Sequence, residues 1–137
     1  MENKLTPAAV AALSDEELAK ECAERVMGWE YIAQGCGWYA RKGDGYAYQC
    51  AVFSPATSLA DAAMCTEAML AKGWFMELEG YKSFSTGKPY YVCRLWMDGD
   101  DPVPSSKEAT VKVCAYAATE PRARAEAALL ACAKEEG

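Results

Sequence analysis

Two runs of alternating apolar and polar residues, joined by a short polar segment, constrain the fold of this chain most. The first run covers residues 74–81, the second covers residues 89–97, and residues 83–88 link them. The apolar side chains recur at every second position: Trp74, Met76 and Leu78 in the first run, and Tyr91, Cys93 and Leu95 in the second. Alternation of this kind is typical of half-buried strands, and two strands linked in this way form an antiparallel hairpin. Residues 110–117 are a candidate third strand.

Helical signals precede these strands. Ser14 and Glu17 have the spacing of a capping box, and the apolar residues after them recur every four positions until Gly28, which is the expected helix end. Thr6 and Pro7 predict a short helical turn before this helix, with Pro7 at the first helical position.

Two further helices are predicted. Ser58 is the expected N-cap of a helix over residues 59–72 that Gly73 ends, and residues 119–121 open a last, alanine-rich helix that runs to Lys134. The expected apolar face of the first is Leu59, Ala62, Ala63, Thr66 and Leu70, and that of the second is Ala125, Leu129 and Cys132.

Residues 28–57 interleave aromatic residues with glycines, which indicates loops and short strands, with a hairpin turn at residues 43–45. The order of elements predicts one α+β domain over residues 1–137, a small antiparallel sheet sandwiched between helices in α/β/α layers. Residues 1–13 form an N-terminal arm or short helix in this interpretation. The polar, proline-containing stretch 98–108 is the candidate mobile loop.

The chain contains no histidine, and this absence excludes several classes of chemistry. Serine and cysteine hydrolases with an imidazole base, histidine acid–base catalysis and histidine metal sites all need that side chain. Seven cysteines are present without a Cys-x-x-Cys pair, so we expect no metal site and no cofactor, and buried unpaired thiols in a reducing cytoplasm. The net charge of −6 argues against a partner made of DNA or RNA, and no apolar run is long enough to span a membrane.

Three further sequence patterns are too incomplete to indicate a binding or catalytic site. Gly35, Cys36 and Gly37 resemble the start of a dinucleotide fingerprint, but the third glycine is missing. The acidic stretch 98–101 lacks the spacing of a calcium loop, and a solvated turn explains it better. Cys36 is the thiol most expected to be exposed, although no histidine is present to activate it. We therefore expect no catalytic residues.

The aromatic residues gather in the middle of the chain, since all except Tyr116 lie between residues 28 and 97. Polar-tipped aromatic side chains at a surface are typical of stacking or interface sites, so Trp29, Tyr31 and Trp38 are candidate ligand-binding residues. A structural role in the core or in a dimer interface is the alternative.

Two helix starts are candidate anion sites. Ser54, Thr57 and Ser58 bring hydroxyl and amide groups to the start of the helix at 59–72, where ordinary N-capping is the alternative. Arg122 and Arg124 lie at the start of the last helix, where a cation opposes the helix dipole. A phosphate bound by these arginines would offset that cost. The alternative is that both arginines are solvated and bind no ligand.

Three segments resemble the phage ABA-sandwich domain family in the order that the family has them. They are SDEELAKECAERVMGW at residues 14–29, FSPATSLADAA at residues 53–63 and ATEPRARAEAALLA at residues 118–131. The chain departs from the family pattern at residues 58–61, where the family has a tighter Ser-Thr-Asp start, and in its long stretch at 98–106. The resemblance implies a small phage or prophage protein with a sheet between helices.

The chain is also similar, more distantly, to the Thoeris anti-defense sponge proteins of the first type. That resemblance implies a phage-encoded, non-catalytic sponge in the host cytoplasm that binds and sequesters a cyclic nucleotide or a cyclic ADP-ribose-type immune signal. It further implies a homo-oligomer, with aromatic residues stacked on the base and Arg122 or Arg124 on the phosphates. The alternative is a protein-interaction module that contacts a host or phage protein through exposed aromatic side chains.

Overall fold

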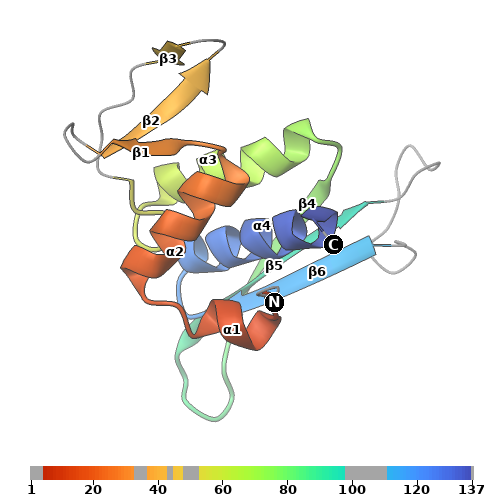
Figure 1. The fold of residues 1–137 in the computed structure, drawn as a ribbon. Coiled ribbons are helices and arrows are strands. Elements are labelled where there is room, and N and C mark those ends of the chain that lie inside the picture. The colour runs from red at the N-terminus through yellow and green to blue at the C-terminus, as the bar shows by residue number, and fades with distance from the viewer. Residues whose placement is uncertain (1–4, 33–36, 43–44, 48–52, 98–110, 137) are drawn as a thin grey trace.

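A computed structural model describes residues 5–32, 37–42, 45–47, 53–97 and 111–136 (Figure 1). Its main sheet has three antiparallel strands in the order β4 (Phe75–Lys82), β5 (Pro89–Met97) and β6 (Val111–Ala117). Leu78 is paired with Cys93, and Cys93 with Ala115. The predicted hairpin is confirmed, because the alternating runs pair antiparallel through the short turn between them, and the third strand forms as expected.

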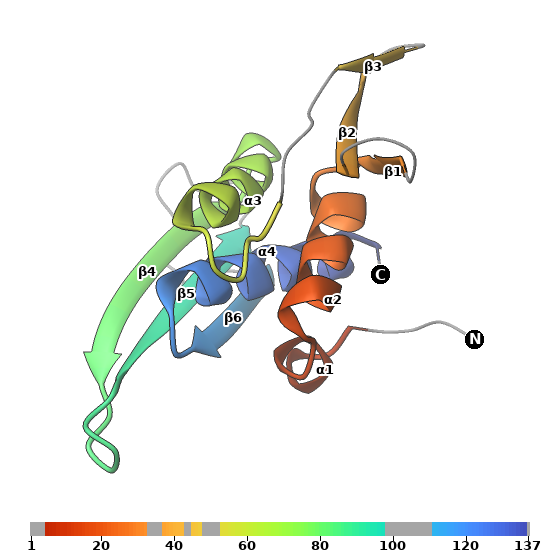
Figure 2. The same ribbon diagram turned by 90° about the vertical axis from the view of Figure 1, so that its left-hand side faces the viewer.

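Helix α4 (Glu120–Glu136) lies along this sheet and forms the centre of the molecule (Figure 2). The expected face of Ala125, Leu129 and Cys132 is buried. Further buried residues line its other sides: Ala123, Ala127, Ala128, Leu130 and Ala131. Small side chains let neighbouring backbones approach closely on every side, which explains why this helix is alanine-rich rather than amphipathic.

The N-terminal helices pack on the side of α4 that faces away from the sheet (Figure 2). They are α1 (Pro7–Ala11), α2 (Asp15–Glu21) and the π-helical turn η1 (Cys22–Val26). The predicted capping box is confirmed, because the Glu17 amide donates to the Ser14 hydroxyl over 3.1 Å and the Ser14 amide donates to the Glu17 carboxylate over 2.9 Å. Gly28 ends the helix with a φ of 70°. The π-helical turn was not predicted, because local sequence patterns do not distinguish it from an α-helix.

Helix α3 (Leu59–Ala71) begins at Ser58 as predicted, and the Asp61 amide donates to the Ser58 hydroxyl over 3.2 Å. Its predicted apolar face is wrong at both ends, because Leu59 is 48% exposed and Leu70 is 40% exposed. The buried stripe is Ala62, Cys65, Thr66 and Met69. This stripe has the regular helical spacing of three and four residues, and it places the two leucines toward the edge of the helix.

A second small sheet contains β1 (Glu30–Ile32), β2 (Gly37–Lys42) and β3 (Gly45–Ala47), all antiparallel (Figure 1). The pairing of Lys42 with Gly45 agrees with the predicted hairpin, whose turn residues 43–44 lie outside the described residues. This sheet projects from the body of the molecule. At its base the rings of Trp29 and Phe53 lie edge to face, with their centroids 4.9 Å apart.

The predicted α+β class with a small antiparallel sheet and helices is confirmed. The predicted α/β/α layering is not found in the described part of the chain, because the helices there lie on one side of β4, β5 and β6 (Figure 2). We call the opposite side of these three strands the open face. The predicted mobile loop at 98–108, the acidic stretch within it and Cys36 lie outside the described residues.

Candidate functional site

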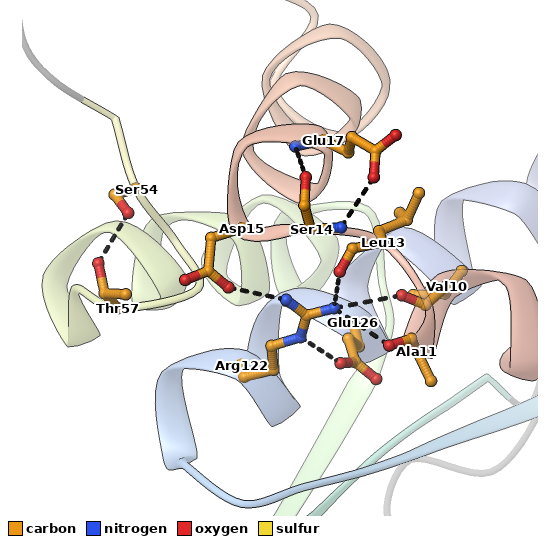
Figure 3. Close-up of polar contacts among 10 residues, drawn as sticks. All are labelled: Val10, Ala11, Leu13, Ser14, Asp15, Glu17, Ser54, Thr57, Arg122 and Glu126. Atoms are coloured by element: carbon orange, nitrogen blue, oxygen red, sulfur yellow. Dashed lines mark hydrogen bonds and ion pairs between the residues drawn. The ribbon is translucent and has the colours of Figure 1, made fainter.

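The Arg122 side chain forms hydrogen bonds and ion pairs with other residues of the same molecule (Figure 3). Its Nε donates to Glu126 over 2.6 Å, and its Nη1 donates to Asp15 over 2.9 Å. Its Nη2 donates to the Leu13 carbonyl over 2.5 Å and lies 3.4 and 3.5 Å from the carbonyls of Ala11 and Val10. The side chain therefore joins the start of α4 to the end of α1 and the start of α2.

Arg124 is engaged on a different side of α4. Its Nε donates to Glu120 over 2.9 Å, and its Nη1 lies 3.4 Å from the Thr66 hydroxyl and 3.8 Å from the Met76 sulfur. The side chain is 18% exposed. Residues two positions apart on a helix point in nearly opposite directions. Arg122 and Arg124 therefore do not converge on one anion.

The hydroxyl groups at the start of α3 are also paired. The Ser54 and Thr57 hydroxyls lie 2.7 Å apart (Figure 3). The Ser58 hydroxyl accepts from the Asp61 amide. The Asp61 carboxylate accepts from the Ser54 amide over 2.9 Å. A carboxylate of the protein itself thus takes the position that the helix dipole favours for an anion.

The predicted aromatic residues lie near one another at the base of the projecting sheet. Trp29 directly precedes β1, is half-buried and contacts Phe53. Tyr31 and Trp38 are register partners on β1 and β2. The structure therefore brings these three positions together, at a distance in the fold from the two arginines at the start of α4 (Figure 1).

The open face carries two aromatic pairs, one toward each end of the sheet, that were not predicted as a site. Phe75 and Trp96 are stacked with centroids 5.9 Å apart, and Tyr81 and Tyr90 are stacked at 5.4 Å. Tyr116 on the neighbouring strand is 63% exposed. Trp96 is buried, whereas Tyr81 and Tyr116 at the hairpin end are exposed, and exposed rings of this kind are typical of surfaces that bind flat groups or partners.

One arginine in the middle of the open face pairs with two glutamates, which leaves a net charge of −1 in this group. Arg94 contacts Glu77 over 3.3 Å and Glu79 over 2.5 Å. The pKa of Glu79 is lowered by its hydrogen bonds with Tyr81 and Arg94. The same Glu79 contact raises the pKa of Tyr81, so this phenol remains protonated at neutral pH and does not repel an anion.

The hairpin end of the sheet contains an open hollow of about 880 Å³. Its lining is aromatic, hydroxylic and basic: Tyr81, Tyr90, Tyr116 and Phe84, then Ser83, Ser85 and Thr86, then Lys82 and Lys88, with Pro89, Ala117 and Ala118 completing it. The hollow is shallow and open to solvent, so a ligand there would keep part of its surface exposed. Flat rings, hydroxyl groups and ammonium groups together suit a ligand with a planar and an anionic part.

The signal for this hollow was present in the sequence. In the run 89–97, residues at alternate positions are apolar on both sides, with Tyr90, Val92 and Trp96 opposite the predicted core face. A strand with two apolar faces needs two covered faces or a partner. The number of aromatic residues favours the stretch around Trp29, so the hairpin end of the sheet was not predicted as a site.

Thiol and metal chemistry have little support in the described residues. Cys22, Cys65, Cys93 and Cys132 are buried thiols, and Cys114 is half-buried. Burial raises the pKa of Cys93 to about 12, which suppresses the reactive thiolate. Across the described ranges, no group of three or more Cys, Asp or Glu side chains is placed to hold a metal ion.

Comparison with protein-family models, with curated proteins and with solved structures finds no match for this chain. Within the described residues, no helix has both the length and the apolar character needed to cross a membrane.

Proposed function

We propose that this protein is a non-catalytic binding protein that sequesters a nucleotide-derived signal. The observation that carries the proposal is the hollow at the hairpin end, which combines four aromatic side chains with Lys82 and Lys88. Rings can stack on a base, and the ammonium groups can hold phosphate oxygens. The resemblance to phage proteins favours a cyclic nucleotide or cyclic ADP-ribose-type signal of bacterial defence, which a phage protein would remove from the host cytoplasm.

The hollow is a better candidate for the phosphate contacts than the two arginines at the start of α4. Arg122 and Arg124 would have to leave carboxylates and carbonyls of the protein before they could bind a ligand. Lys82 and Lys88 form no ion pair within the described residues and line the hollow directly. An ammonium group that is already solvated loses no internal partner when it binds a phosphate.

The first experiment is native mass spectrometry of the protein purified from cells with and without an active enzyme that makes such signals. We expect an added mass of several hundred daltons only with the active enzyme. Calorimetric titration with cyclic nucleotides and cyclic ADP-ribose isomers then identifies the ligand. The absence of binding to every one of these compounds would contradict the proposal.

Variants locate the site. The double substitution Lys82→Ala and Lys88→Ala should weaken binding roughly a hundredfold or more, because each charge-assisted hydrogen bond contributes about 1.5–3 kcal/mol. Lys112→Ala is the matched control, since Lys112 lies at the other end of the same sheet, paired in register with Trp96. Unchanged affinity in the double variant, together with loss in Arg124→Ala, would move the site to the start of α4.

A protein-interaction module is the second candidate. Phe84 is fully exposed at the hairpin tip and Tyr116 is largely exposed, which favours contact with another macromolecule. In that case Phe84→Ser would abolish binding to a host or phage protein, and no small molecule would be bound.

A further inference from the structure

The exposed large apolar side chains of the described residues form two separate groups. Leu59 and Leu70 lie on α3, and Tyr81, Phe84 and Tyr116 lie at or near the hairpin end of the sheet. The two groups are at opposite ends of the molecule, with α3 at the top of Figure 1 and the hairpin turn at the bottom. Within one copy of the chain, the two groups therefore cannot pack against each other.

The hairpin tip presents Phe84 on a well-ordered turn. The Ser83 amide donates to the Lys88 carbonyl over 2.9 Å, and the Gly87 amide donates to the Ser83 carbonyl over 2.8 Å. Hydroxyl contacts of Ser83 and Thr86 add to this turn. An exposed aromatic side chain on a preorganised turn loses little conformational entropy on binding, which is a property of interface anchors.

The exposed side of α3 offers a matching surface, which we call the α3 stripe and define as Leu59, Ala63, Glu67 and Leu70. The positions are spaced by three and four residues, so they share one side of the helix and extend over roughly 16 Å. The two leucines are 48% and 40% exposed. The stripe is therefore mostly apolar and contains one exposed carboxylate, that of Glu67.

The charges of the two surfaces are complementary. Lys82 and Lys88 flank Phe84 in a chain whose net charge is −6, and Glu67 lies on the α3 stripe. Within the described residues, none of these three side chains forms an ion pair. Opposite charges beside matching apolar groups favour one register of association.

We propose that the hairpin tip of one copy of this chain docks on the α3 stripe of a second copy. Phe84 then packs against Leu70 at one end of the stripe, and the flanking lysines approach Glu67, one helical turn away. In a two-fold dimer the same contact occurs twice, and in a ring or filament it repeats head to tail. This inference does not depend on the proposed ligand, because it concerns the protein without any bound molecule.

Sedimentation and light scattering of the ligand-free chain between 1 and 100 μM test the proposal. We expect a dimer or a larger assembly, and Phe84→Ser or Leu70→Gln should raise its dissociation constant roughly tenfold or more. A mixture of these two variants should associate better than either alone, since each retains the surface that the other lacks. A wild-type chain that is monomeric throughout this range would overturn the proposal.

Charge reversal provides a second test that folding defects cannot mimic. Lys88→Glu and Glu67→Lys should each weaken association, and the double variant should recover it. Lys112→Glu is the matched control, because it makes the same charge change at the far end of the sheet, and it should leave association unchanged. An assembly that survives both Phe84→Ser and Lys88→Glu would refute this contact. Leu70 and Glu67 lie outside the lining of the hollow, so calorimetry of Leu70→Gln and Glu67→Lys reports ligand binding separately from association, and failure of either proposal can be recognised.

Discussion

Replacement of Arg122 by methionine is expected to destabilise the fold, although part of this side chain is near the surface. The Arg122 side chain is 16% exposed, and its guanidinium donates to Glu126, Asp15 and the carbonyl of Leu13. Methionine retains most of the apolar volume and removes all of these donors. The Glu126 side chain, which is 6% exposed, would then lose its only charged partner shown by the structure.

The magnitude follows from the burial of each partner. Removal of one member of a buried ion pair costs about 3–5 kcal/mol, whereas the contact with the largely exposed Asp15 contributes less than about 1 kcal/mol. Glu126 can take up a proton in the variant, so the lower end of the range, about 3 kcal/mol, is expected at pH 7.5. With a urea m-value of about 2 kcal/mol/M, the unfolding midpoint should fall by roughly 1.5 M.

Urea unfolding followed by far-ultraviolet circular dichroism measures this change. The double variant Arg122→Met and Glu126→Leu is the decisive comparison, because it removes both charges and leaves none buried. It should recover more than half of the lost stability. A double variant as unstable as the single one would refute the argument from buried charge.

The pH dependence gives an independent check. Burial raises the pKa of Glu126, and Arg122 offsets part of that increase. A carboxyl group with a raised pKa in the folded state stabilises the fold most below its ordinary pKa, and this contribution is lost as the pH rises through the folded value. The penalty of Arg122→Met should therefore shrink between pH 7.5 and pH 4.5. A penalty that grows toward acid would contradict this assignment.

Three further predictions follow from the described contacts. Leu129→Ala should cost about 2–5 kcal/mol in urea unfolding because Leu129 is fully buried, whereas Leu70→Ala should cost less than about 1 kcal/mol; equal costs would contradict the orientation of α3. Ser58→Ala should cost about 1 kcal/mol by removing the α3 N-cap, and Ser58→Asp should restore it; a neutral alanine variant would show that the cap is dispensable. In thiol labelling of the native protein at pH 8, half-buried Cys114 should react well before Cys93, whose pKa is raised to about 12; rapid modification of Cys93 would exclude its buried position.

Local sequence signals predicted the elements of this fold well. The capping box at Ser14, the N-cap at Ser58 and the strand at Pro89–Met97 each depend on contacts within a few residues or on a period-two pattern. Such interactions are encoded in neighbouring side chains, so they can be read without the tertiary structure.

The candidate site was less accessible to sequence reasoning. Arg122 and Arg124 stood out as cations at a helix start, but their partners Asp15 and Thr66 are distant in the chain, and nothing local indicates that both guanidinium groups are engaged. The hairpin hollow likewise joins the turn at Phe84 to Tyr116 from another strand. Contacts between residues far apart in sequence exist only after folding.

The sequence by itself determined the order of the main helices and strands, that the strands run antiparallel, and that imidazole chemistry is excluded. Only the tertiary structure decided which sides of these elements are covered. Leu70 is apolar yet exposed, and the alanine-rich α4 is buried on several sides, because burial depends on which neighbours pack against an element and not on its own hydrophobicity. The open face and the α3 stripe, on which both proposals depend, are consequences of that packing.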